Sequence, residues 1–169
     1  MSDNGNDRVM RYTKGNNTGV LVAGGNSRGN DTNQLNYPMG IYFESLSNSL
    51  IIANTYAHNI VRWRIGENNW TLIAGNLNAS RGNSPSSFSD PLDLTVDPMG
   101  NLYVADRSNR RVQSFSAGQT EGRTIAGITG VQGSNSNLLN GPCGIIFDSQ
   151  LNLYVVDTVG NRVQKFLRY

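Results

Sequence analysis

The sequence predicts an all-β protein built from repeated four-stranded units. A hairpin recurs along the chain, and its marker residues Asp3, Asn54, Asp106 and Asp157 lie 51, 52 and 51 positions apart. Self-similarity at a period of this size is the signature of a repeat architecture. The chain is also rich in Gly, Asn and Ser, which suits short strands joined by turns, and no helical pattern of useful length occurs.

The first strand of each complete unit is predicted to begin at a proline: Pro38–Phe43, Pro91–Val96 and Pro142–Phe147. Proline has no N–H group and fits the first position of a strand. The turn after the second of these strands has Gly100 where a positive φ is expected. The third unit has Leu151 at that position, so its turn is either strained or of another type.

The second strand of each unit is nearly all apolar: Leu50–Asn54, Leu102–Asp106 and Leu153–Asp157. A strand that is buried on both faces has this pattern, so neighbouring units should cover it above and below. The third strand alternates only in part, and we place it nearer the rim: Arg8–Tyr12, Asn59–Trp63, Arg111–Phe115 and Arg162–Phe166.

The fourth strand of each unit ends in Ala-Gly: Gly19–Gly24, Trp70–Gly75 and Arg123–Gly127. A long polar crossing then leads to the next proline, over residues 25–37, 76–90 and 128–141. Each crossing has one apolar residue three positions before that proline, namely Leu35, Phe88 and Leu139. We expect these residues to anchor the crossings on the sheet below.

The order of these motifs resembles the NHL repeat. Proline, an apolar strand, Gly-Asn-Leu-Tyr-Val-Ala-Asp and Asn-Arg-Val-Gln-x-Phe match it closely in Pro91–Phe115 and Pro142–Phe166, and more loosely in Pro38–Trp63. Only the second half is present in Asp3–Tyr12. NHL repeats are blades of β-propellers that usually have six blades. The resemblance therefore implies a partial β-propeller of four-stranded antiparallel blades, with the first strand of each blade innermost and the fourth outermost.

Thirteen strands, or about three and a quarter blades, are predicted from these motifs. Residues 1–24 would end a first blade with its third and fourth strands, 25–75 and 76–127 would form two full blades, and 128–169 a blade without its outer strand. A six-bladed propeller needs nearly twice as many strands. Three alternatives follow: a piece of a longer protein, a ring completed by a second copy, or an open arc. The lack of recognisable caps favours the first.

Each of three hairpin turns is flanked by an acid and a base at fixed spacing: Asp3 and Arg8, Asp106 and Arg111, Asp157 and Arg162. Where the acid is replaced by Asn54, the base is replaced by Asn59. We hypothesise that each charged pair bridges its own turn, with the Asn pair as a neutral substitute. An exposed pair would stabilise the fold by only about 0–1 kcal/mol. A structural role in the turn is favoured over a charged binding ring.

The composition argues against several classes of function. The net charge of +2, from 14 basic and 12 acidic residues, is too mild to imply nucleic-acid binding by itself. The one cysteine, Cys143, has no histidine partner and is expected to be a small buried residue. The one histidine, His58, falls in a turn and is expected at the surface, whereas catalytic zinc sites usually take two or three histidines. The sequence therefore predicts no catalytic residue, metal site or cofactor, and no enzyme.

No run of 18 apolar residues and no signal peptide occur, so no membrane span is expected. This slightly favours the cytoplasm but leaves the compartment open.

In an antiparallel meander, the turns between second and third strands lie at the same end as the crossings between units. That end should collect six candidate contact residues: Arg28, Tyr56, His58, Arg81, Arg107 and Arg110. Loops on a rigid scaffold usually carry binding function. We therefore expect a non-catalytic scaffold that presents this face to a protein partner. RNA binding is the alternative, a propeller lyase or hydrolase is disfavoured by the single histidine, and a solvated rim without a binding role also stays open.

Overall fold

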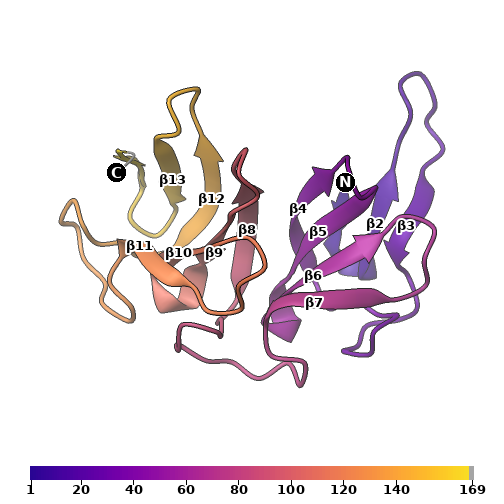
Figure 1. Ribbon diagram of the computed structural model, residues 1–169, viewed down its shortest axis with the longest axis horizontal. Coiled ribbons are helices and arrows are strands. Elements are labelled where there is room, and N and C mark those ends of the chain that lie inside the picture. Colours follow the sequence, from indigo (N-terminus) through magenta and orange to yellow (C-terminus); the bar gives the residue numbers. More distant parts are fainter. Residues whose placement is uncertain (168–169) are drawn as a thin grey trace.

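Every regular element of the chain is a short strand or a single 3-10 turn in the computed structural model, which describes residues 1–167. No α-helix occurs in this part of the chain, and the predicted all-β fold is confirmed. The strands pair in chain order into four antiparallel sheets, here called sheets 1 to 4, which follow one another across the molecule (Figure 1).

The strand bounds of each sheet are as follows. Sheet 1 contains β1 (Ser2–Asp3), β2 (Arg8–Arg11) and β3 (Val20–Gly24). Sheet 2 contains β4 (Pro38–Glu44), β5 (Ser49–Asn54), β6 (Asn59–Arg64) and β7 (Trp70–Gly75). Sheet 3 contains β8 (Pro91–Val96), β9 (Leu102–Asp106), β10 (Arg111–Phe115) and β11 (Arg123–Gly127). Sheet 4 contains β12 (Pro142–Phe147), β13 (Leu153–Asp157) and β14 (Arg162–Phe166).

The turns between second and third strands share one backbone shape. In sheets 1 to 3 the turn is a single 3-10 helix, over η1 (Asn4–Asn6), η2 (Thr55–Ala57) and η3 (Arg107–Asn109). Each ends in a residue with left-handed backbone, namely Asp7, His58 and Arg110. The count of thirteen strands was wrong by one, because the two residues of β1 are too few to form a sequence pattern.

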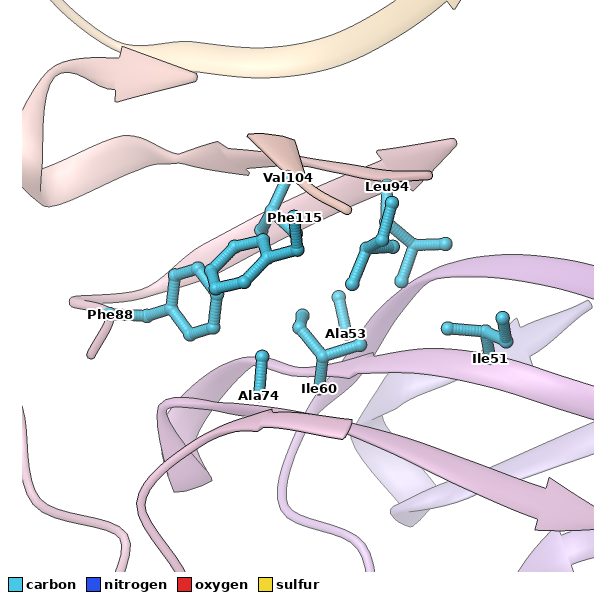
Figure 2. Packing of buried hydrophobic residues seen from close by; sticks show 9 residues of the cluster. Ile51, Ala53, Ile60, Ala74, Phe88, Leu94, Val104 and Phe115 are labelled. Carbon is cyan, nitrogen blue, oxygen red and sulfur yellow. The ribbon is translucent and has the colours of Figure 1, made fainter. Parts of the chain in front are cut away.

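The hydrophobic core is divided into three clusters, each between two successive sheets. Figure 2 shows the cluster between sheets 2 and 3, where Phe88 and Phe115 lie over Ile60 and Ala74. The two phenylalanine rings are 5.5 Å apart between centroids. The predicted anchors are confirmed, since all three apolar residues of the crossings are fully buried: Leu35, Phe88 and Leu139.

The second strands are buried as predicted where a sheet covers both of their faces. All six residues of β5 are buried, and so are four of the five in β9. In sheet 4, by contrast, Val156 is 40% and Val163 63% exposed, while the corresponding Ala105 and Val112 of sheet 3 are at 0%. The difference arises because crossing 128–141 covers sheet 3, and no segment among residues 1–167 covers the far side of sheet 4.

The structure settles two local predictions. The third strand lies nearer the rim than the first two, as predicted, because the strands of sheet 3 follow the order β8, β9, β10, β11. It is nevertheless well covered, since β10 is buried at four of five positions and its Gln113 donates to the Pro85 carbonyl at 3.2 Å. The alternatives for Leu151 are also resolved. Its N–H bonds the Asp148 carbonyl at 2.9 Å, as Gly100 bonds Asp97, so the turn is the same and Leu151 takes a strained φ of 62°.

Across residues 1–167, we find no helix with the length and apolar character needed to cross a membrane.

Candidate functional site

The turn of sheet 3 is built around a buried ion pair. The Asp106 carboxylate accepts bonds at 2.8 Å from Arg111 Nε, Asn109 Nδ2 and the Ser89 N–H. Burial raises the pKa of Asp106, and the three donors and the positive charge of Arg111 oppose that shift. The stabilisation of about 0–1 kcal/mol expected from the sequence assumed an exposed pair, and therefore does not apply to this buried one.

The remaining N–H groups of Arg111 fasten crossing 76–90 to sheet 3. They donate to the carbonyls of Asn83, Ser84 and Ser87 at 2.9 Å and to Thr129 Oγ1 at 3.2 Å. Five bonds use all five donors of a guanidinium. The arginine is thus a clamp between its sheet and the crossing that leads into that sheet.

Sheets 1 and 4 repeat the pair in more exposed settings. Arg162 Nε lies 3.1 Å from Asp157, and its other nitrogens donate to carbonyls of crossing 128–141. Arg8 Nε lies 2.8 Å from Asp3, where the side chains are 39% and 31% exposed. The bond from Arg8 lowers the pKa of Asp3. All three predicted pairs are thus in hydrogen-bonding contact.

The asparagines of sheet 2 behave differently from the hypothesis. Asn54 Oδ1 accepts the Asn36 N–H at 2.7 Å, as Asp106 accepts that of Ser89. Asn54 Nδ2 and Asn59 Oδ1 are buried and have no hydrogen-bond partner among the described residues. Trp70 instead holds crossing 25–37, through its indole N–H to the Gln34 carbonyl at 2.8 Å. The Asn pair is therefore not a neutral bridge.

We define the loop face as the end of the sheets formed by turns 4–7, 55–58, 107–110 and 158–161 with crossings 25–37, 76–90 and 128–141. Its main aromatic feature is Tyr56, which is 47% exposed and stacks on Tyr37 with ring centroids 4.6 Å apart. Asp7 accepts the Tyr37 N–H at 2.8 Å and pairs with Arg28 at 3.0 Å. Tyr37 and Asp7 were not among the predicted contact residues, because only the folded turn brings them beside Tyr56 and Arg28.

His58 is not a surface residue, as the sequence predicted, but is only 5% exposed. Its Nδ1 lies 3.2 Å from the Asp90 N–H and 3.6 Å from the Asp90 carboxylate, and its Nε2 accepts from Arg81 Nε at 3.1 Å. Burial lowers the pKa of His58, and Arg81 lowers it further, against the opposing charge of Asp90. His58 therefore holds crossing 76–90 and is not available for contact.

The arginines of the loop face differ in their surroundings. Arg28 and Arg81 each pair with an aspartate, at 3.0 and 3.4 Å. Arg110 donates to the Gly130 carbonyl and to Gln132 Oε1 at 3.2 and 3.3 Å. Arg107 is exposed, and within residues 1–167 neither it nor Arg110 forms an ion pair with an acid. The positive charge of the face is thus partly neutralised.

Two positions on the loop face differ in side chain from sheet to sheet although the backbone around them is the same. One is the residue just before the proline of the first strand, and the other is the middle residue of the turn between the second and third strands. They form a tyrosine stack in sheet 2, a 2.6 Å bond between Ser108 and Asp90 in sheet 3, and a contact of Val159 with Gly141 in sheet 4. The loop face therefore combines a constant frame with variable chemistry.

Outside the loop face, Cys143 is half-buried rather than fully buried as predicted. Within residues 1–167, no three His, Cys, Asp or Glu side chains come close enough together to hold a metal ion.

Meander sheets that follow one another in chain order, with the first strands β4, β8 and β12 as neighbours, define a β-propeller. Residues 88–115 match the NHL repeat family, which confirms the resemblance of this chain to that family. It is 32% identical over 115 residues to NHL repeat-containing protein 2 of Bos taurus, an alignment that covers 65% of this chain and 15% of that protein.

Two solved structures show the same fold. A structural genomics protein of unknown function from Bacteroides thetaiotaomicron superposes with a TM-score of 0.76 at 15% identity, over 95% of this chain and 42% of that one. Virginiamycin B lyase from Staphylococcus aureus superposes with a TM-score of 0.58 at 13% identity, over 98% and 47%. The chain therefore spans less than half the length of each of these proteins.

Proposed function

We propose that this chain is a non-catalytic propeller scaffold that binds a protein partner through its loop face. The observation that carries the proposal is the stack of Tyr37 and Tyr56 beside Arg28. Tyrosine and arginine are enriched at protein interfaces and dominate their energetic hot spots. The stack loses little entropy on binding, because its rings are already held in place.

Charge on the loop face favours a protein over RNA as the partner. Single-stranded nucleic acid is usually bound by a positive groove that follows its phosphates. Here Arg28 and Arg81 are paired with aspartates, and the net charge of the whole chain is only +2. A protein surface with mixed charges fits such a face better.

The environment of His58 supports a role without catalysis. A general base needs a ring nitrogen that can reach a substrate. In this protein both nitrogens of the buried imidazole face protein groups, Asp90 on one side and Arg81 on the other.

The test is a selection of binding peptides from a displayed random library with the wild-type chain. Enriched peptides should lose about 10-fold or more in affinity for Tyr56→Ser and Arg28→Gln, as expected of hot-spot residues. Leu46→Ser is the control, because Leu46 is fully exposed in the turn at the other end of sheet 2.

Peptides that bind the Tyr56 and Arg28 variants as tightly as the wild type would exclude the loop face. Salt-sensitive binding of labelled single-stranded RNA, with no peptide enriched, would show that the partner is RNA.

A further inference from the structure

A groove lies between sheets 2 and 3, at the end of the sheets opposite to the loop face. Its volume is about 390 Å³, and Gly100 and residues 116–120 of sheet 3 form part of its rim. Its apolar lining includes Ile51, Ile73, Val96, Leu102 and Phe115. Ile51 lies on the side of sheet 2 that faces sheet 3 (Figure 2). Two charged side chains of sheet 2, Glu44 and Arg62, also line the groove, which therefore combines apolar walls with one acid and one base.

The space between sheets 3 and 4 has the same frame, but two aromatic rings fill it. The Tyr103 ring packs edge-on against Phe147, with centroids 4.7 Å apart. The Tyr103 hydroxyl also donates to the Asp97 carboxylate at 3.1 Å. By strand pairing, Ile51 of sheet 2 stands at the position of Tyr103. Val96 stands at the position of Phe147, since each is the last residue of its first strand. The groove between sheets 2 and 3 therefore has two aliphatic side chains where two rings meet in the neighbouring space.

Sheet 4 shows how a base is placed beside such a ring. Lys165 pairs across the hairpin with Tyr154, and its Nζ lies 5.3 Å from the centroid of the Tyr154 ring. The same Nζ lies 3.5 Å from the Asp148 carboxylate. In sheet 2, Arg62 and Glu44 take the positions of this base and this acid. Nη2 of Arg62 lies 3.3 Å from Oε1 of Glu44. The acid and the base are thus present in sheet 2, whereas the ring is missing.

We propose that this groove binds a small phenol, which supplies the ring that sheet 2 lacks. The ring packs on Ile51 and Val96 and faces the guanidinium of Arg62. The hydroxyl donates to the carboxylate of Glu44, as the hydroxyl of Tyr103 donates in sheet 3. A cation over an aromatic face and a hydrogen bond to an ionised acceptor are both attractive in a partly desolvated site. The volume of the groove suits a molecule of one or two rings, because small-molecule sites usually have about 300–1,000 Å³.

The charges of the groove favour a neutral ligand that carries a hydroxyl donor. Glu44 and Arg62 offset each other, so net charge favours neither an anion nor a cation. Ser47 already donates to Glu44, and a second hydroxyl can join it, because a carboxylate has about four acceptor positions. Arg62 Nε is buried and has no hydrogen-bond partner among residues 1–167, so the guanidinium is not fully engaged within the protein. The site is separate from the loop face and does not depend on the proposed function.

The test is a titration of the whole chain with 4-fluorophenol, followed by fluorine NMR of the ligand. We expect saturable binding with a dissociation constant of about 1 mM or below, which is reasonable for a ligand of this size. 4-Fluorotoluene has a methyl group in place of the hydroxyl and should bind at least about 10-fold more weakly, because it offers Glu44 no donor. Equal binding of the two compounds, or no saturation with 4-fluorophenol, would overturn the proposal.

Two variants fill the groove from the protein side. Val96→Phe and Ile51→Tyr introduce the two rings that meet between sheets 3 and 4. Each should weaken the binding of 4-fluorophenol at least about 10-fold, and circular dichroism shows whether the variant is folded. Val96 is the more tolerant position, because it is only partly buried, whereas Ile51 is 4% exposed. Leu46→Ser is the control and should bind as the wild type does, because Leu46 is fully exposed and does not line the groove.

Two results with these proteins would contradict the assignment. A folded Val96→Phe variant that binds 4-fluorophenol as tightly as the wild type would place the ligand elsewhere on the molecule. Tighter binding of N-acetyltyrosine amide than of 4-fluorophenol would assign the groove to a tyrosine side chain of another protein, and would overturn its assignment to a free phenol.

Discussion

The turns of sheets 2 and 3 have the same backbone conformation, but neutral amide side chains flank the first and a charged pair flanks the second. Asn54 and Asp106 precede their 3-10 turns with φ of −88° and −92°, and the turns end at His58 and Arg110 with φ of 53° and 58°. Inside this common shape, sheet 3 buries a charged pair with all its bonds made, whereas sheet 2 buries two amides with one unpaired group each. The charged pair is therefore not needed to form the turn.

What differs is how each crossing is fastened. Arg111 clamps crossing 76–90 from the third strand, while Trp70 clamps crossing 25–37 from the fourth. Burying an ion pair costs desolvation energy that its attraction offsets only with good geometry. The crossings into sheets 2 and 3 are thus each fastened to the sheet that they enter, one by an indole N–H and the other by an ion-paired guanidinium.

The largest expected effect is that of Asp106→Ala. Removing one partner of a buried ion pair leaves the other charge uncompensated, and such changes cost about 3–5 kcal/mol. Denaturant unfolding would measure the loss. Asp3→Ala in sheet 1 is the matched control, because that pair is largely solvated and the change should hardly register. Similar losses of unfolding free energy in both variants would show that burial does not determine how much the ion pair contributes to stability.

Phe88→Ala and Leu35→Ala test the apolar anchor that the two crossings have in common. Each anchor side chain is fully buried, so the substitutions should cost about 3–5 and 2–5 kcal/mol in unfolding free energy. The exposed Leu77→Ser, in crossing 76–90, should have little effect. If Leu35→Ala had little effect and Phe88→Ala a large one, the two crossings would depend to different extents on their apolar anchors as well as being fastened by different side chains.

A smaller effect is expected from moving the charged pair into sheet 2. Asn54→Asp alone should destabilise the fold, because it buries a charge beside Asn59. Adding Asn59→Arg should recover part of the loss, with a coupling energy of about 0.5–3 kcal/mol in a double-mutant cycle. Zero coupling would mean that the frame of sheet 2, where Ala57 takes the place of Asn109, cannot orient the pair.

The smallest effect is the pH dependence of the His58 contact. Burial lowers the pKa of His58 in the folded chain, so the unfolded chain, with its ordinary pKa of 6.5, binds the proton more readily. The contribution of neutral His58 to stability should therefore be fully present above about pH 6.5 and should be lost as the pH drops below that value. His58→Asn should weaken this dependence in thermal unfolding between pH 7 and pH 5. Asparagine suits the site, since Asn161 takes the same left-handed backbone in sheet 4. An unchanged pH profile would assign the effect to other groups.

The strands, their order and the apolar anchors could be predicted from the amino-acid sequence. These depend on local features, namely the proline at each first strand, the apolar second strand, and the spacing of Leu35, Phe88 and Leu139 from the next proline. The acid and base that flank each turn could also be matched, because hairpin geometry brings neighbouring positions together.

Which of these groups are buried, and what they contact, could not be predicted without the folded arrangement of the sheets. His58 meets Arg81 and Asp90 from positions 23 and 32 residues further along, and the carbonyls that Arg111 clamps lie 24 to 28 residues before it. Contacts of this kind follow from packing one repeat on the next, and the pattern within a single repeat does not contain them.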